Sequence, residues 1–250
     1  MAITMTMFVM GIIIGFVGAG GSGFIIAILT VLFGIPIHTA LGTSLAAMVF
    51  TTVSGAYSHF RAGNVALQTG VVTGIIGSLF AYLGSEVAGI IPVHSLHWFT
   101  AGMLFLSAVL LVFRLFIFQQ RQIARPNQKP RNANFWLRAA LVGAVTGFMS
   151  GTFGIGAAPF IQIGLLIFIG LSVRQAVGTT MLVILPIAVA GGAGYYFQGF
   201  LDIPLLLQVV AGTMAGSYVG AKFTSLAPQP LLKGAMVITP IAAGTILLIS

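Results

Sequence analysis

The chain has 250 residues, of which 58% are apolar and 5% charged, and its mean hydropathy is +1.13. Soluble domains contain about one quarter charged residues, so this composition excludes an ordinary soluble domain and indicates an integral membrane protein. A bilayer core of about 30 Å needs roughly 20 apolar residues per helix, and nearly every stretch between the charges is that long.

The net charge of +8 comes mainly from one segment. Residues 119–134, QQRQIARPNQKPRNAN, together with Arg114 and Arg138 at their edges, contain six of the ten Lys and Arg residues. A basic loop between apolar spans is typical of a cytoplasmic connector, so we expect no nucleic-acid partner. The chain has no cysteine, which excludes disulfides and thiol chemistry.

The first half, residues 1–118, opens on an apolar stretch from about 3 to 34 that the glycine run GAGGSG interrupts at 18–23. This stretch is too long for one straight transmembrane helix, so we expect a broken or re-entrant pair of helices. Three ordinary spans follow, at about 39–60, 66–86 and 97–117. The basic linker 119–134 then leads to the second half.

The second half, residues 135–250, repeats this order with a stretch at about 136–170, interrupted by GTFGIG at 151–156, and spans at about 175–197, 203–222 and 231–249. IPIHTALGTS at 35–44 matches LSVRQAVGTT at 171–180 with a spacing of 136 residues, and the glycine runs match with a small length change. We therefore predict an all-α membrane protein built by tandem duplication.

The number of crossings decides how the two repeats are oriented. If each opening stretch crosses once, the repeats are parallel, and Arg174, Lys222 and Lys233 lie outside when the basic linker is inside. If each stretch turns back at its glycines, the repeats are inverted and all ten Lys and Arg residues lie inside, as the positive-inside tendency favours. We favour inverted repeats with both termini outside, and parallel repeats are the alternative.

The glycine turns are the first candidate for a binding site. A backbone turn within the bilayer must be buried in protein or line an aqueous cavity, because unpaired N–H and C=O groups cost several kcal/mol in hydrocarbon. A helix that begins after such a turn points its free N–H groups into that space, which favours an anion.

The GTS and GTT motifs open the next span in each repeat and supply hydroxyl donors. We expect the two motifs to meet near the middle of the membrane, where an alternating-access carrier places its substrate. The predicted substrate-binding residues are Gly20, Gly21, Ser22, Gly23, Gly42, Thr43, Ser44, Gly154, Gly156, Gln162, Gly178, Thr179 and Thr180.

Small residues also have a packing role in membrane helices, and we interpret Gly212, Gly216 and Gly220 in that way. Gln162 either reaches the ligand or bonds a neighbouring helix. Arg61 and Arg174 either form a cytoplasmic anion funnel or extend their charged ends to the interface.

Candidates for proton coupling are few. They are His38, His59, Glu86 and Asp202, and the competing readings are a hydrogen-bonded interfacial histidine and a solvated carboxylate at a helix end. His94 and His97 are expected in an outer loop, with no metal site.

Three sets of segments carry a family resemblance: GFVGAGGSGF, then IPIHTALGTSLAA with SGAYSHFRAGNV, then GFMSGTFGIGAAPF with LSVRQAVGTT. Together they resemble the sulfite exporter TauE/SafE family of membrane permeases over nearly the whole chain. The resemblance implies export of a small sulfur-containing anion, such as sulfite, thiosulfate or sulfoacetate, across a bacterial inner membrane. The proton gradient is the expected driving force, no cofactor is expected, and a homodimer is compatible with this interpretation.

Two other functions compete with a carrier. A passive anion channel would use the same neutral donors but would not saturate. An intramembrane enzyme would need a base, a nucleophile or a metal cluster within the bilayer, whereas the only two acidic residues, Glu86 and Asp202, fall at predicted span ends.

Overall fold

The computed structural model describes residues 1–17, 22–115, 133–224 and 229–249. Every regular element in these ranges is helical. The first half forms α1 (Ala2–Val17), α2 (Ser22–Val31), α3 (Ile37–Arg61), α4 (Leu67–Ile90) and α5 (Val93–Phe113). The second half forms α6 (Ala133–Phe153), α7 (Ala158–Gly164), which continues as the π-helical turn η3 (Leu165–Ile169), then α8 (Val173–Phe197), α9 (Ile203–Thr224) and α10 (Gln229–Ile249).

Five of the helices are long and apolar enough to cross a membrane, within the described residues: α3, α4, α5, α8 and α9. The shorter apolar helices include α1, α2 and the continuous α7–η3 segment. The expected all-α membrane architecture is therefore confirmed at this level.

Two spans, α4 and α5, differ in their bounds from the prediction. α5 begins directly after Pro92, because a proline at the helix start removes no intrahelical N–H donor, and it ends at Phe113. His94 and His97 therefore lie in the first turns of α5, so their predicted place in an outer loop is wrong. α4 continues past Glu86 to Ile90, which places that carboxylate one turn before the helix end.

The helix starts repeat at a constant offset along the chain. Four pairs of helix starts are each separated by 136 residues: Ser22 and Ala158, Ile37 and Val173, Leu67 and Ile203, and Val93 and Gln229. The helix ends Val17 and Phe153 have the same offset, so the predicted length change between the glycine runs is wrong.

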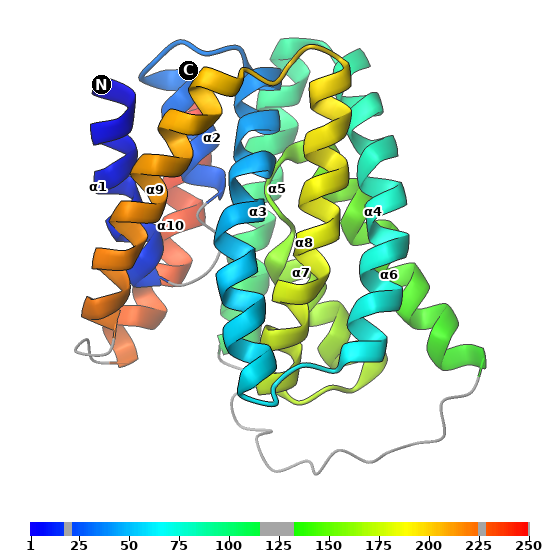
Figure 1. The fold of residues 1–250 in the computed structure, drawn as a ribbon. Helices are drawn as coiled ribbons and strands as arrows, with labels where there is room; N and C mark the ends of the chain where they lie inside the picture. The colour runs from blue at the N-terminus through cyan, green and yellow to red at the C-terminus, as the bar shows by residue number, and fades with distance from the viewer. Residues whose placement is uncertain (18–21, 116–132, 225–228, 250) are drawn as a thin grey trace.

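Both chain termini lie at the top of Figure 1, whereas the loop between α3 and α4 lies at the bottom. α1 descends from the N-terminus and α2 returns to the top. α6 rises from the bottom, and α7 with η3 returns there before α8 begins. Each opening stretch is thus a pair of helices that run in opposite directions.

Glycines allow two helix pairs to pack at backbone distance. In the pair α6 and α4, a Cβ atom on Gly147 would collide with the Gly77 carbonyl oxygen. In the pair α9 and α1, Gly212 and Gly216 face the carbonyl oxygens of Thr4 and Phe8 in the same way. The predicted packing role of Gly212 and Gly216 is confirmed.

Candidate functional site

The turn between α6 and α7 contains three left-handed residues. Gly154 and Gly156 each have φ of 64°, and Ala157 has φ of 47°. Glycine adopts this conformation freely, whereas an alanine pays about 1 kcal/mol because of its Cβ atom. These residues reverse the chain inside the protein, and Pro159 in the first turn of α7 favours the new helix start.

Ser44 of α3 joins this turn to the start of α2. Its hydroxyl lies 3.2 Å from the carbonyl oxygen of Ser22 and 3.4 Å from that of Gly154, so it can donate to either. A Cβ atom on Gly156 would lie 3.9 Å from the Ser22 hydroxyl oxygen and would collide with the Met48 side chain. We call Ser22, Ser44, Met48, Gly154 and Gly156 the central cluster.

Several buried polar groups at or near this cluster have no hydrogen-bond partner among the described residues. They include the hydroxyls of Ser22 and Thr43 and the amide oxygen of Gln162. A buried unsatisfied group costs about 1–3 kcal/mol, so it calls for an explanation.

The first N–H groups of α2 also lack intrahelical acceptors. The central cluster thus offers neutral donors, hydroxyls and main-chain amides, which suit a small anion.

The expectation that the GTS and GTT motifs meet is wrong. Gly42 lies against the Cβ atom of Tyr195, near the end of α8, whereas Gly178 lies against His59 and Asn64, at the end of α3 and in the loop after it. Gly178 and Tyr195 are 17 residues apart in α8, which corresponds to about 25 Å of helix. The two motifs therefore lie near opposite ends of the α3–α8 pair.

The two motifs also use their hydroxyls differently. Thr179 accepts a 2.9 Å hydrogen bond from the N–H of Ala66, the residue before α4, and Thr180 donates to the carbonyl oxygen of Ala176 at 2.7 Å. Thr179 thus holds the α3–α4 connection in place, whereas Thr43 remains unpartnered.

The other predicted binding residues differ in their placement. Gly23 packs against the Leu104 side chain of α5, and Gln162 is buried in α7. Gly20 and Gly21 lie outside the described residues.

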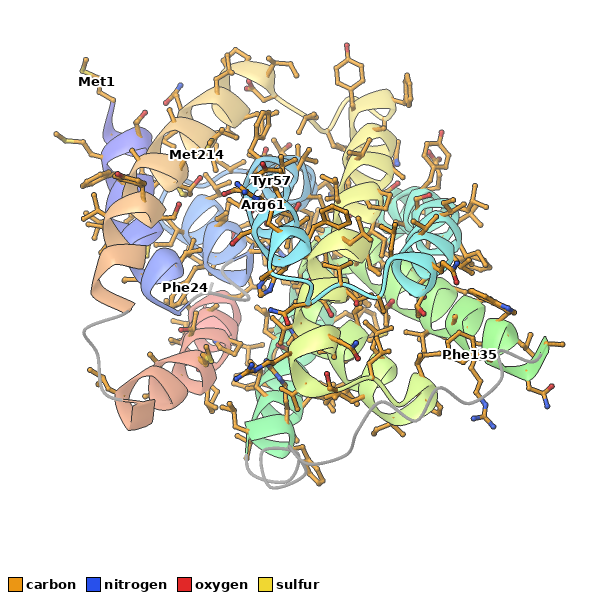
Figure 2. The ribbon with its side chains drawn as sticks, turned by 60° about the horizontal axis from the view of Figure 1, so that its bottom comes forward. Met1, Phe24, Tyr57, Arg61, Phe135 and Met214 are labelled. Carbon is orange, nitrogen blue, oxygen red and sulfur yellow. The ribbon has the colours of Figure 1, made fainter. Side chains whose placement is uncertain are left out.

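Arg61 and Arg174 are exposed at the same end of the molecule, where α3 ends and α8 begins. The guanidinium carbon of Arg61 lies 6.0 Å from the centre of the Tyr57 ring, and Figure 2 shows the two residues together at the end of α3. This placement is compatible with the predicted anion funnel.

The four candidates for proton coupling have local partners or neighbours. The Nε2 atom of His38 lies 3.0 Å from the carbonyl oxygen of Ala88, and its ring stacks on Phe200. Asp202 accepts from the N–H of Leu205 at 3.0 Å and so caps α9, as a helix-end carboxylate would.

The remaining two candidates lie beside residues of the other repeat. Glu86 accepts from the Gln198 side chain at 3.4 Å, and His59 borders Gly178. Proton coupling by any of the four stays a prediction, and the described residues contain no group of three or more metal-ligating side chains.

Sequence reasoning missed two residues next to the turn. The buried hydroxyl of Tyr195 lies 2.9 Å from the carbonyl oxygen of Gly151 and so holds the end of α6. Its repeat equivalent is His59, and a polar side chain at the same position of both copies was a usable signal. Met48, which fills the space beside Gly156, had no such signal.

Broken helices, several apolar spans and buried neutral donors are typical of a multi-pass membrane transporter. The sequence profile of the family described as "Sulfite exporter TauE/SafE" matches residues 3–247. The chain belongs to this family, so the resemblance noted in the sequence is confirmed. At the level of the family, it is a probable membrane transporter and not an enzyme.

Curated relatives of this chain are named as transporters. It is 54% identical to "Probable membrane transporter protein YdhB" of Bacillus subtilis (strain 168), over 99% of this chain and 100% of the relative. It is 31% identical to "Probable membrane transporter protein YtnM" of the same strain, over 82% of this chain and 68% of the relative. A probable membrane transporter of Methanocaldococcus jannaschii is 27% identical over 90% of this chain and 86% of its own length. No solved structure matches.

Proposed function

We propose that this protein is a secondary transporter that exports a small sulfur-containing anion, such as sulfite, thiosulfate or sulfoacetate, by alternating access coupled to protons. The observation that carries this proposal is the central cluster. There the unpartnered Ser22 hydroxyl at the start of α2 faces the glycine turn of the other repeat.

The chemistry of the central cluster suits a sulfur oxyanion. Such an anion has several acceptor oxygens, which can bond a hydroxyl and main-chain N–H groups at the same time. A helix start attracts the negative charge without a buried cation. Since no ion pair would have to be broken, the anion could also leave readily, as a carrier requires.

Reciprocal contacts support inverted repeats. Gly42 contacts Tyr195 and the Phe200 carbonyl, and the residue 136 positions later, Gly178, contacts His59 and the Asn64 carbonyl, which are the repeat equivalents of those partners. When residue i contacts residue j and the equivalent of i contacts the equivalent of j in return, the two copies are related by a two-fold axis. Because α3 and α8 run in opposite directions in Figure 1, we place this axis in the membrane plane.

The charge distribution supports the orientation. Arg61 and Arg174 lie at one end of the molecule, and both termini lie at the other. We therefore propose a cytoplasmic location for the arginine end and an external location for the termini, in a bacterial inner membrane. The two repeats would be residues 1–118 and 135–250, joined by the cytoplasmic basic linker 119–134.

The proposed site can be tested by anion-dependent thermal stability of the purified protein in detergent. Sulfite, thiosulfate and sulfoacetate are each titrated, with chloride at equal ionic strength as the reference. Saturation at 100 times Kd adds about 2.7 kcal/mol to the free energy of unfolding, so the anion that binds should raise Tm by several degrees.

Variants locate the anion. Ser22→Ala and Thr43→Val should reduce the Tm rise because each removes a buried donor. Thr73→Val is the matched control, since Thr73 of α4 is also buried and unpartnered but neither belongs to the central cluster nor, unlike Thr43, adjoins one of its residues in the chain. A Tm rise that persists unchanged in Ser22→Ala would remove the central cluster from the binding site.

A further inference from the structure

The lower half of α3 carries a stripe of polar side chains within an otherwise apolar span. Thr51, Ser54, Ser58 and Arg61 are all exposed. At 3.6 residues per turn they fall, with Thr43 and Ser44, within a sector of about 100°. Ser44, Thr51 and Ser58 follow one another at intervals of seven residues, which is about two turns each. We call Thr51, Ser54, Ser58 and Arg61 the α3 polar stripe.

The α3 polar stripe differs from the rest of the exposed surface of the same helix. Phe50, Val53 and Phe60 are also exposed and occupy the neighbouring sector, as lipid-facing side chains do. The Thr51 hydroxyl donates to the Met48 carbonyl oxygen of its own helix at 3.1 Å, whereas water is a more favourable surrounding than hydrocarbon for the Ser54 and Ser58 hydroxyls. One exposed half-helix thus has an apolar face and a hydroxyl face side by side.

The second repeat lacks these hydroxyls. The residues 136 positions after the members of the α3 polar stripe are, in the same order, Ile187, Ala190, Gly194 and Phe197. α4 covers this part of α8: a Cβ atom on Gly77 would lie 2.8 Å from the Ile187 side chain, and one on Gly194 would collide with the Ser85 hydroxyl. This end of the α3–α8 pair is closed by direct helix packing.

α9 is the repeat equivalent of α4, and it does not cover α3 in the same way. In Figure 1 the lower end of α9 lies far to the side of the lower end of α3. The α3 polar stripe is exposed for this reason. It runs from Arg61, at the bottom of the molecule, up to Thr51, and Ser44 of the central cluster lies buried two turns further along the same sector of α3.

We infer that the α3 polar stripe lines a water-filled entrance through which the anion reaches the central cluster from the end of the molecule that carries Arg61. This inference rests on the proposed function and names the route of its substrate. Arg61 attracts the anion at the mouth, and the Ser54 and Ser58 hydroxyls solvate it along the way. The equivalent route at the other end is closed by α4.

Cysteine accessibility tests this entrance directly, because the chain has no native cysteine. Single variants Thr51→Cys, Ser54→Cys and Ser58→Cys are treated in proteoliposomes with a membrane-impermeant anionic methanethiosulfonate, supplied on both faces. Val53→Cys and Phe60→Cys are matched controls on the apolar face of the same helix. Ala190→Cys is the equivalent of Ser54→Cys in the other repeat.

We expect the three stripe variants to react at least tenfold faster than the apolar-face controls, because only a water-exposed thiol ionises to the reactive thiolate. Ala190→Cys should react as slowly as those controls. Equal labelling rates on the two faces of α3 would overturn the inference. Slow labelling at every position, as expected if a second copy packed on α3, would also overturn it.

The same labelling separates this inference from the proposed function. Sulfoacetate is added as the competing anion and should slow the labelling of Ser58→Cys in a saturable way. If the stripe variants are labelled rapidly and sulfoacetate does not slow this labelling, the result supports the entrance and counts against the proposed substrate.

Discussion

Ala157 holds the one left-handed conformation of a non-glycine residue in the described chain. Its repeat equivalent is Gly21, so the other copy has the residue that this conformation favours. Ala157→Gly relieves about 1 kcal/mol of backbone strain but also removes a fully buried methyl group, which costs about as much, so Tm in detergent should stay within a few degrees of that of the unchanged protein.

The opposite change, from glycine to alanine at the neighbouring turn residue Gly154, should lower the stability of the protein. A Cβ atom on Gly154 would be 3.0 Å from the Cα atom of Leu41, and φ is 64° there, so Gly154→Ala adds a steric clash to the backbone strain. A fall in Tm for Ala157→Gly as large as the fall for Gly154→Ala would contradict the account of this turn.

The placement of the predicted site residues agrees with the structure in part, and their binding role stays a prediction. Ser22 and Ser44 were predicted together with the glycine turn, and they lie together at it. Thr179 and Thr180 were predicted beside them, but they are engaged near the other end of the α3–α8 pair. The repeat identifies equivalent residues, but the proposed two-fold axis in the membrane plane would place equivalents at opposite depths unless they lie on the axis itself.

At the scale of the helices, glycines determine which helices can pack closely against each other. Gly147→Ala would place a methyl group against the backbone of Gly77, which neither helix can vacate without moving apart. We expect a loss of roughly 1–3 kcal/mol or more, measured as lower Tm and lower yield of monodisperse protein. Gly102→Ala is the control, because nothing lies within 4 Å of its added Cβ atom. Equal effects of the two substitutions would argue against close packing of α4 and α6.

Helix positions could be predicted from the sequence because apolar length, prolines and glycines determine them. The break between α6 and α7 and the start of α8 followed from such signals. The contacts among helices did not follow, because a helix that is apolar on all sides has no pattern to show which side faces a neighbour. The α3 polar stripe was visible as hydroxyls at helical spacing in one repeat only, but its meaning depended on the position of α9.

The whole molecule combines two equivalent halves with one uneven feature: α4 packs on α8, whereas α9 leaves the lower half of α3 exposed. In an alternating-access carrier, these two arrangements would exchange during each transport cycle. A passive channel would instead need a continuous open route, and in the described chain Ser22 and Ser44 of the central cluster are buried.

Counterflow in proteoliposomes tests the carrier account most directly. Vesicles that contain the purified protein are loaded with unlabelled thiosulfate, sulfite or sulfoacetate, and uptake of the same anion in radiolabelled form is followed from outside. We predict saturable uptake that the internal anion accelerates and that Ser22→Ala strongly reduces. The account would be contradicted by uptake that rises linearly with concentration and does not depend on the internal anion. Absence of uptake for every sulfur anion tested would also contradict it.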